Sequence, residues 1–409
     1  MPRAERLGSG NTRLKGSDMP NRFLLFGLIA CAIWASAAYG QNNDNAAPEA
    51  ERAPPVGLKD AFAGKFLIGA AGDLRGYADA ELENIKANYD VMTPENCMKP
   101  QPLHPWEDRY SWYTSDAMVE WCEDNDVEVW GHTLLWHSQT GRWFFEPGPD
   151  GEPVTRELAM ERLQDHITTV VGRYKGRIVG WDVVNEAIDD RGTGQTENLR
   201  NYSWYQTVGP DVLTMAFKWA READPDAELY YNDYGIESGA ARNTGKHASS
   251  MMLIKRLIEE GAPIDGVGIQ GHWTARTNLD DVEQAIINYK SLGLKVAISE
   301  LDVAVIGSNS GAFPTRGGFR RRGFGGRSFT PEPASAEALE QQAEFYGKLF
   351  EIFERHSDTI SRVTFWGISD RRSWRSRQSP LLFDRELKPK PAYQAILDVG
   401  LDRNIESQP

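Results

Sequence analysis

Two glutamates stand directly after apolar runs that read as buried strands. Glu186 ends the stretch WDVVNE at residues 181–186, and Glu300 ends the stretch AISE at residues 297–300. For either glutamate alone, the ordinary interpretation is a solvated side chain at the rim of a sheet. Two such glutamates, together with His, Asn and Trp at other strand ends, favour a catalytic role instead. Paired carboxylates are the usual machinery for breaking a glycosidic bond, because one donates a proton to the leaving oxygen while the other attacks the anomeric carbon.

The segments that must position these glutamates are of two alternating types. Short apolar runs of strand character recur at 66–71, 89–93, 128–133, 178–184, 228–232, 266–270, 295–300 and 362–367. Amphipathic segments with helical periodicity lie between them, at 156–174, 213–222, 249–260, 279–292 and 334–355. Eight such units predict an α/β fold, a closed (β/α)8 TIM barrel that forms a single catalytic domain over residues 59–401.

A barrel of this type predicts where functional residues lie, because its active sites are at the C-terminal ends of the strands. Nearly every predicted strand ends in polar, aromatic or ionisable residues. They are Thr93–Asn96, His132, Asn185–Glu186, Asn232–Tyr234, Gln270–His272, Glu300–Asp302 and Trp366. Strands must end in something polar, but chance does not place Glu, Asn, Gln, His and Trp at so many ends.

The composition excludes several other classes of protein. Of 409 residues, 40% are hydrophobic and 25% are charged, which is ordinary for a globular chain. The formal net charge is −14, from 45 Lys and Arg against 59 Asp and Glu. This balance repels nucleic acid and anionic lipid, so we expect neither as a partner. The sequence shows neither the Cys/His spacing of a zinc site nor a GxGxxG motif after the first strand, and we expect no metal and no cofactor.

The N-terminal residues read as a targeting segment. An apolar stretch at 23–38 follows Arg22 and is short for a membrane-spanning helix, so residues 1–40 are predicted to be an extension with a secretory signal peptide. Residues 41–58 read as a linker. We therefore expect a secreted or periplasmic protein. A lipid anchor at Cys31 is the less favoured alternative, because the apolar run continues past this cysteine.

Two further cysteines, Cys97 and Cys122, remain in the predicted mature chain. They could pair in an exported protein, but the simpler interpretation is two small buried apolar residues.

The order of the motifs resembles that of glycoside hydrolase family 10, the endo-β-1,4-xylanases. The chain carries TPENCMKP, GHTLLWHSQT, WDVVNEAIDD, LYYNDY, GIQGHW, ISELDV and FWGISDRRSW in the order of that family. The resemblance implies retaining hydrolysis of xylan, with Glu186 as general acid/base and Glu300 as nucleophile. It also implies that His272 donates to Glu300 and that Asp302 fixes the tautomer of His272. Retention requires a carboxyl separation of about 5–5.5 Å.

The same resemblance implies a set of sugar-binding side chains. They combine hydrogen-bonding groups with flat rings, which suits the alternating hydroxyls and apolar faces of a sugar. They are Glu95, Asn96, Lys99, His132, Trp136, Gln139, Tyr234, Gln270, Trp366 and Trp374. Asn185 is expected to donate to the sugar 2-hydroxyl or to the nucleophile. We expect His137 to be structural, and we expect core positions for Trp121, Trp130, Trp181 and Trp219.

Other functions stay open at this point. A mixed-specificity β-1,4-glucanase/xylanase of the same family would carry the same glutamates, and a non-catalytic carbohydrate-binding barrel is the less favoured third interpretation. The expected ligands are xylan and xylo-oligosaccharides, and the expected state is a monomer.

One segment departs from the family pattern. Residues 308–333 form a Gly/Arg-rich insertion, with five arginines between 316 and 327 and no acidic residue before Glu332. Arginines 371, 372, 375 and 377 form a second basic cluster. A surface loop is the favoured interpretation of the insertion. The alternative is a loop that borders the cleft and binds the carboxylates of uronic-acid decorations, for which Arg is a good bidentate partner.

Overall fold

The computed structural model describes residues 56–148, 151–191, 194–305 and 334–402. The predicted signal segment at 1–40, most of the linker at 41–58 and the insertion at 308–333 lie outside the described residues. Leu58, which the sequence places at the end of the linker, is fully buried and begins helix α1, so the compact unit starts before residue 59. Within the described ranges, no helix has both the length and the apolar character that crossing a membrane requires.

Eight parallel strands close into a barrel. They are β1 Leu67–Ala71, β2 Val91–Thr93, β3 Glu128–Trp136, β4 Gly180–Asn185, β5 Glu228–Asp233, β6 Gly266–Ile269, β8 Lys295–Ala304 and β9 Ile360–Phe365. Each strand from β1 to β6 pairs with the next, β6 pairs with β8, β8 with β9, and β9 with β1, which closes the ring. The predicted (β/α)8 TIM barrel is confirmed.

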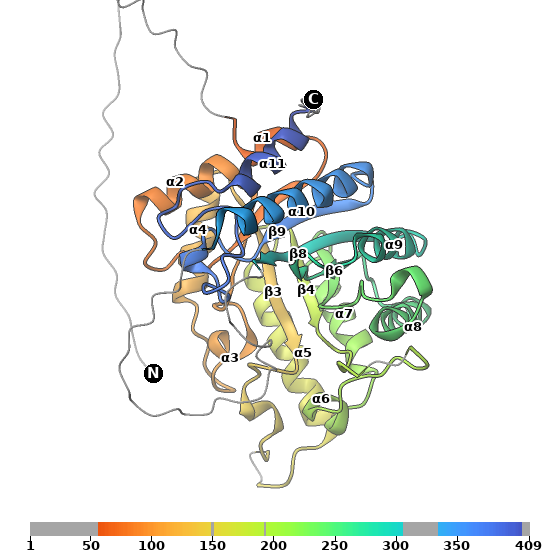
Figure 1. Ribbon diagram of the computed structural model, residues 1–409. Coiled ribbons are helices and arrows are strands. Elements are labelled where there is room, and N and C mark those ends of the chain that lie inside the picture. The colour runs from red at the N-terminus through yellow and green to blue at the C-terminus, as the bar shows by residue number, and fades with distance from the viewer. Residues whose placement is uncertain (1–55, 149–150, 192–193, 306–333, 403–409) are drawn as a thin grey trace, which may run out of the picture. The chain divides into compact units, whose positions relative to one another are not determined.

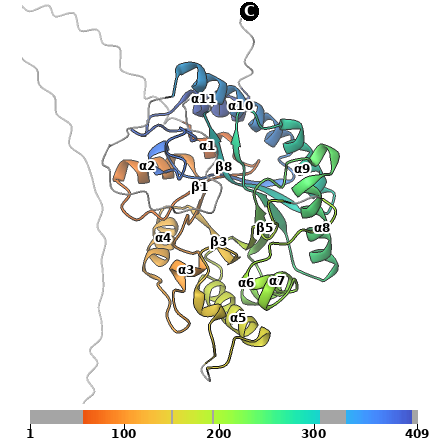
Figure 2. The same cartoon turned by 60° about the horizontal axis from the view of Figure 1, so that its bottom comes forward.

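Helices surround the strands (Figure 1, Figure 2). The longer helices are α2 Asp79–Asn88, α4 Tyr113–Asp124, α5 Arg156–Arg173, α7 Val212–Ala223, α8 Gly245–Glu259, α9 Leu279–Lys290, α10 Ala336–Arg355 and α11 Pro391–Gly400. Short helices are α1 Leu58–Ala61, α3 Pro100–Leu103 and α6 Ser203–Thr207. The five predicted amphipathic segments are confirmed as α5, α7, α8, α9 and α10. Helices α1 and α11 come from opposite ends of the described chain and pack together.

The strands differ from their predicted bounds where they approach the site. Strand β3 continues three residues past the predicted Thr133, and β8 continues four past Glu300. The extension of β8 pairs with an unexpected short strand, β7 (His272–Thr274), in which His272 lies opposite Asp302. The added residues are mostly apolar, but whether they continue as strand depends on pairing with β4 and β7, which a single-sequence pattern does not contain.

The barrel interior contains aromatic side chains that pack directly against glycines. It also contains a buried ion pair between Arg362 and Asp182. A Cβ atom added at Gly131 would lie 2.1 Å from the ring of Trp181, so only glycine leaves room for this indole. Arg362 is 1% exposed, lies 3.8 Å over the ring of Trp130, and reaches Asp182 at 3.3 Å. Losing one partner of such a buried pair typically costs about 3–5 kcal/mol, because the other charge is left uncompensated.

The core residues largely match expectation. Trp130, Trp181 and Trp219 are buried as predicted, whereas Trp121 is only partly buried at the core's edge. Cys97 and Cys122 are both buried and are not joined in a disulfide, as the simpler interpretation predicted. The core therefore needs no covalent cross-link between these two cysteines.

Candidate active site

Glu186 lies where β4 gives way to a loop. Its backbone has a φ of +55°, and its amide donates to the carbonyl of Asn232 at 2.8 Å. The residue is 2% exposed. Its Oε2 accepts from Trp136 Nε1 at 3.1 Å, and its Oε1 accepts from Gln270 Nε2 at 3.1 Å. Donors from the ends of β3 and β6 therefore fix the orientation of this carboxyl group.

Glu300 lies in β8 and is 5% exposed. Its Oε1 accepts from Asn232 Nδ2 at 2.8 Å, and its Oε2 lies 3.1 Å from His272 Nε2. Asn232 is fully buried near the end of β5, and its own oxygen accepts from the hydroxyl of Ser299. Because Ser299 engages the oxygen, the amide nitrogen of Asn232 is turned towards Glu300.

Three amide side chains connect the two glutamates. Asn232 Nδ2 also donates to Asn185 Oδ1 at 3.0 Å, and Gln270 Nε2 lies 3.3 Å from the same oxygen. The chain of contacts therefore runs from Glu186 through Gln270, Asn185 and Asn232 to Glu300. Asn185 was expected to donate to the sugar 2-hydroxyl or to the nucleophile, and the amide that reaches Glu300 is that of Asn232. Asn185 instead joins the two amides on either side of it.

His272 carries a positive charge beside Glu300. Its Nε2 faces Glu300 Oε2 at 3.1 Å and its Nδ1 faces Asp302 Oδ2 at 3.0 Å, so both ring nitrogens donate to carboxylates. Burial opposes this charge, but Asp302 and Glu300 outweigh it and raise the pKa of His272 to about 9. Burial likewise acts to raise the pKa of Asp302, yet His272 and Arg375 hold it below its usual value. The indole of Trp374, although half exposed, donates to Asp302 at 2.9 Å.

The basic cluster predicted after β9 is largely engaged. Arg375 pairs with Asp302. Arg371 and Arg372 both pair with Glu81 in α2, and the Arg372 guanidinium also stacks over Tyr77. These arginines therefore neutralise buried carboxylates and do not form a simple basic patch.

A second group of polar side chains follows β2. Lys99 is 7% exposed and its Nζ lies 3.3 Å from Asn96 Oδ1. Burial lowers the pKa of Lys99 even though Glu300 and Glu95 attract its proton. Burial also raises the pKa of Glu95, against the pull of Lys99. The loop is anchored by Asp73, whose Oδ1 accepts the backbone amides of Asn96 and Cys97. The structure thus brings the three predicted residues together, near enough for the charge of Glu300 to act on Glu95 and Lys99.

The ring of Trp366 lies between two histidine rings. His132 is buried, donates through Nδ1 to Asp182 at 2.9 Å, and meets Trp366 edge to face at 5.3 Å. Trp366 also lies 6.4 Å from His272, so it bridges the β3 and β7 sides of the site. The backbone of Gln139 accepts from the Gln101 amide at 2.7 Å, which ties its loop to α3.

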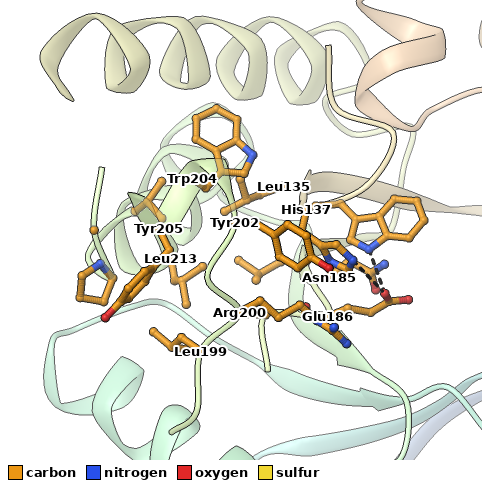
Figure 3. Close-up of a pocket in the computed structure, with 16 residues that line it drawn as sticks. Leu135, His137, Asn185, Glu186, Leu199, Arg200, Tyr202, Trp204, Tyr205 and Leu213 are labelled. Atoms are coloured by element: carbon orange, nitrogen blue, oxygen red, sulfur yellow. Dashed lines mark hydrogen bonds and ion pairs between the residues drawn. The ribbon is translucent and has the colours of Figure 1, made fainter. Parts of the chain in front are cut away.

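A cavity that is partly open to solvent adjoins Glu186. Figure 3 shows Glu186 and Asn185 at one end of this cavity and Trp204, Tyr205 and Leu213 towards the other. Most of the lining is apolar. His137, expected to be structural, lies 4.0 Å from Glu186 Oε2 and stacks on Tyr202 at 4.6 Å, so it belongs to the wall of this cavity.

Tyr234 lies beside this region, and its hydroxyl and one face of its ring are already engaged by other side chains. Its hydroxyl donates to Asp190 and accepts from Arg200 Nη2 at 2.7 Å. Lys246 Nζ lies 3.7 Å from the centre of its ring. At most one face of the Tyr234 ring therefore remains for the predicted stacking of a sugar.

The sequence located most of this site but missed several residues that organise it. Asn232 was noted only as part of a strand end, and the roles of Asp182, Arg200 and Arg375 carried no signal in the sequence pattern. Asp182 and Arg375 act through contacts with segments far along the chain, and Arg200 acts through the fold of the loop after β4. Within the described ranges, no cluster of three or more His, Cys, Asp or Glu side chains is arranged to hold a metal ion.

Comparison with known proteins gives a consistent result. The family model for glycosyl hydrolase family 10 matches residues 57–399. Endo-1,4-beta-xylanase B of Paenibacillus barcinonensis is 37% identical over 348 residues, which cover 83% of this chain and 97% of that protein. Several relatives are much longer, and the chain spans only 27 to 31% of their length. One is named exoglucanase XynX, from Acetivibrio thermocellus, at 36% identity over 83% of this chain.

Solved structures agree with this comparison. The crystal structure of a mutant of the intracellular xylanase TsXylA of Thermoanaerobacterium saccharolyticum, in complex with xylotriose, is similar with a TM-score of 0.72. The two proteins are 36% identical, and the match covers 83% of this chain and 97% of that one.

Proposed function

We propose that this chain, which belongs to glycosyl hydrolase family 10, hydrolyses β-1,4-xylosidic bonds within xylan. The observation that carries the proposal is the pair of nearly buried glutamates, Glu186 and Glu300, joined through three amides at the C-terminal face of the barrel. Such a pair supplies both the proton and the nucleophile that a glycosidic bond requires.

Glu186 is assigned as the general acid/base. As the bond between C1 and the leaving oxygen breaks, the oxygen keeps the electron pair and takes the proton of the Glu186 carboxyl group. In the second half of the reaction the Glu186 carboxylate removes a proton from water, which then attacks C1. Trp136 and Gln270 hold the carboxyl group in one orientation for both steps. The adjoining cavity lies on the leaving-group side under this assignment.

Glu300 is assigned as the nucleophile that bonds to C1. A nucleophilic carboxylate has to be ionised, and the cationic His272 and the amide of Asn232 both stabilise its negative charge. Two successive displacements at C1, first by Glu300 and then by water, leave the configuration unchanged, so the mechanism is retaining.

The remaining predicted residues are assigned to sugar binding. Glu95, Asn96 and Lys99 lie where they could bind hydroxyls on the non-reducing side of the cut, next to Glu300. Trp366 and Trp374 are proposed to crowd the ring beside the cut, where the CH2OH group of a hexose would clash. A clash of a few atoms changes the transition-state free energy by about 1–3 kcal/mol. We therefore expect the enzyme to prefer xylose over glucose but to retain some activity on glucose-based substrates.

Product analysis tests the proposed activity. Incubation with neutral arabinoxylan, followed by chromatography over time, should give early products of many lengths, as random internal cleavage does. Release of one short product from the start would contradict an endo-acting enzyme.

A β-1,4-glucanase activity is the second candidate, because one relative is named an exoglucanase. The same assay on carboxymethylcellulose separates the candidates. A rate there that equals the rate on xylan would favour a mixed glucanase, and no rate on either polymer would favour a non-catalytic barrel.

Export and the monomeric state are also proposals. The proposal of export rests on the sequence of residues 1–40, with Cys31 as the alternative site of a lipid anchor. The mass of the protein recovered from cells would show whether this segment is removed.

A further inference from the structure

The backbone of Glu186 occupies a conformation that needs support. Its φ of +55° lies in the left-handed region, which is unfavourable for a non-glycine residue. Such a conformation persists only where neighbouring groups hold it. The amide of Glu186 is held by the carbonyl of Asn232 at 2.8 Å. Its carbonyl, on the other side of the same residue, needs a donor of its own.

Arg200 supplies that donor. Its Nε donates to the Glu186 carbonyl at 2.8 Å, and the residue is only 7% exposed. The chain returns to Glu186 because Ile188 and Leu199 pair in antiparallel fashion, and the Arg200 amide then donates to the Ala187 carbonyl at 2.8 Å. Arg200 is thus tied to the start of this loop through both its backbone and its side chain.

The guanidinium group is itself fixed at its other end. Arg200 Nη2 donates to Asp190 Oδ1 at 2.7 Å and to the hydroxyl of Tyr234 at 2.7 Å. Tyr234 also donates to Asp190, and Lys246 lies 3.7 Å from the same carboxylate. A planar fork with two bonded ends cannot rotate without losing a contact, so the position of Nε is defined.

We propose that Arg200 is a positioning residue for proton transfer, which sets the direction of the Glu186 carboxyl group by holding the Glu186 backbone through the Nε contact. The inference rests on the proposed acid/base role of Glu186. Arg200 makes no bond to the reacting atoms, and Asp190 and Tyr234 act by fixing Arg200.

Two substrates with different leaving groups distinguish a role in proton transfer from a general structural role. A phenyl β-xylobioside needs a proton on its departing oxygen, whereas a dinitrophenyl β-xylobioside departs as a stable anion and does not. Arg200→Gln should lower kcat/KM for the phenyl substrate by about 100-fold, the loss typical of a misplacement of roughly 1 Å. Its kcat/KM for the dinitrophenyl substrate should stay close to that of the wild type. Equal losses on both substrates would overturn the proposal.

Arg191→Gln is the matched control, because Arg191 lies in the same loop but is highly exposed and forms its ion pair with Asp189, away from Glu186. Both substrates should be cleaved by it at wild-type rates. If Arg200→Gln fails to fold, Asp190→Asn takes its place, since that side chain is half exposed and the change removes one holder of the guanidinium. It should show the same selectivity with a smaller loss, and an unselective loss or no loss in a folded Asp190→Asn would overturn the proposal.

The same two substrates distinguish this inference from the assignment beneath it. Glu186→Ala should itself lose activity selectively on the phenyl substrate. If it loses both activities equally, the acid/base role of Glu186 is at fault, and the role of Arg200 falls with it. If Glu186→Ala is selective and Arg200→Gln is not, only the positioning role is wrong.

Discussion

Glu186 and Glu300 are the same residue type and nearly equally buried, so the different roles proposed for them must come from their neighbours. Glu300 faces a cationic imidazole and a buried amide. Glu186 faces an indole, an amide and a largely apolar cavity. A nearby cation favours a carboxylate, whereas apolar surroundings favour a carboxylic acid. The proposed division of roles between the two glutamates rests on this contrast in their neighbours.

Removing either carboxyl group should abolish most of the activity on xylan. Glu186→Ala should lower kcat by about 10²–10⁴-fold, the usual contribution of general acid–base catalysis. Glu300→Ala should lose at least as much, because no covalent intermediate can form. The measurement is the initial rate of reducing-sugar release, with Glu259→Ala, an exposed glutamate in α8, as the control.

Azide tells the two roles apart. With a dinitrophenyl xyloside and azide, Glu186→Ala should form the β-azide, because azide replaces water in the second displacement. Glu300→Ala should form the α-azide, because azide attacks C1 directly. The opposite pairing of products and variants would exchange the two assignments.

The charge on His272 should appear in the pH dependence of stability. Its pKa is about 9 in the folded protein against 6.5 in an unfolded chain. Its contribution to the free energy of unfolding is therefore complete below pH 6.5 and declines as pH rises to about 9. In urea denaturation, the stability gap between wild type and His272→Gln should shrink across that window. A gap that stays constant from pH 6 to about pH 9 would contradict a charged His272.

At the scale of elements, strand ends explain what the sequence could reveal about the site. Glu186 and Glu300 follow apolar runs, and a parallel barrel gathers such ends on one face, so their proximity was predictable. The contact from Asn232 to Glu300 depends on how β5 and β8 face each other across β6, and a single-sequence pattern does not contain that information. Arg375 and Asp302 meet only because the chain after β9 folds back over β8.

A buried histidine pair joins the end of α3 to α5. His104 Nε2 donates to the carbonyl of Glu107 at 3.1 Å, so its Nδ1 accepts from His166 Nδ1, also at 3.1 Å. This arrangement leaves His166 Nε2 unprotonated, buried and without a partner within the described structure. A proton added there would have no acceptor. Burial, with a smaller effect of His104, accordingly lowers the pKa of His166 to about 3.

This pair should make the protein less stable in acid. Between pH 6.5 and about 3, the unfolded chain binds a proton at His166 that the folded chain excludes, so the free energy of unfolding falls as pH falls. The stability difference between wild type and His166→Gln should therefore narrow over that range, measured by chemical denaturation. A difference that does not change with pH would show that His166 is charged in the folded state or exposed to water.

At the scale of the whole molecule, the fold was more predictable than its details. The count of eight strand-like runs and the five helical segments led to the barrel, because periodicity reports burial directly. The short β7, the lengthened β3 and β8, and the burial of Leu58 did not follow from periodicity, since each depends on packing against distant segments. Of the expected sugar-binding residues, Trp136 and Gln270 contact Glu186, and the hydroxyl and one ring face of Tyr234 are engaged by Asp190, Arg200 and Lys246.

The stereochemistry of the first product tests the central claim most directly. Proton NMR during hydrolysis of a xylo-oligosaccharide can follow the anomeric signal before mutarotation scrambles it. A double displacement through Glu300 predicts that the β-anomer appears first and the α-anomer grows in later. Initial release of the α-anomer would mean a single displacement by water, which would contradict a covalent role for Glu300 and the mechanism built on it.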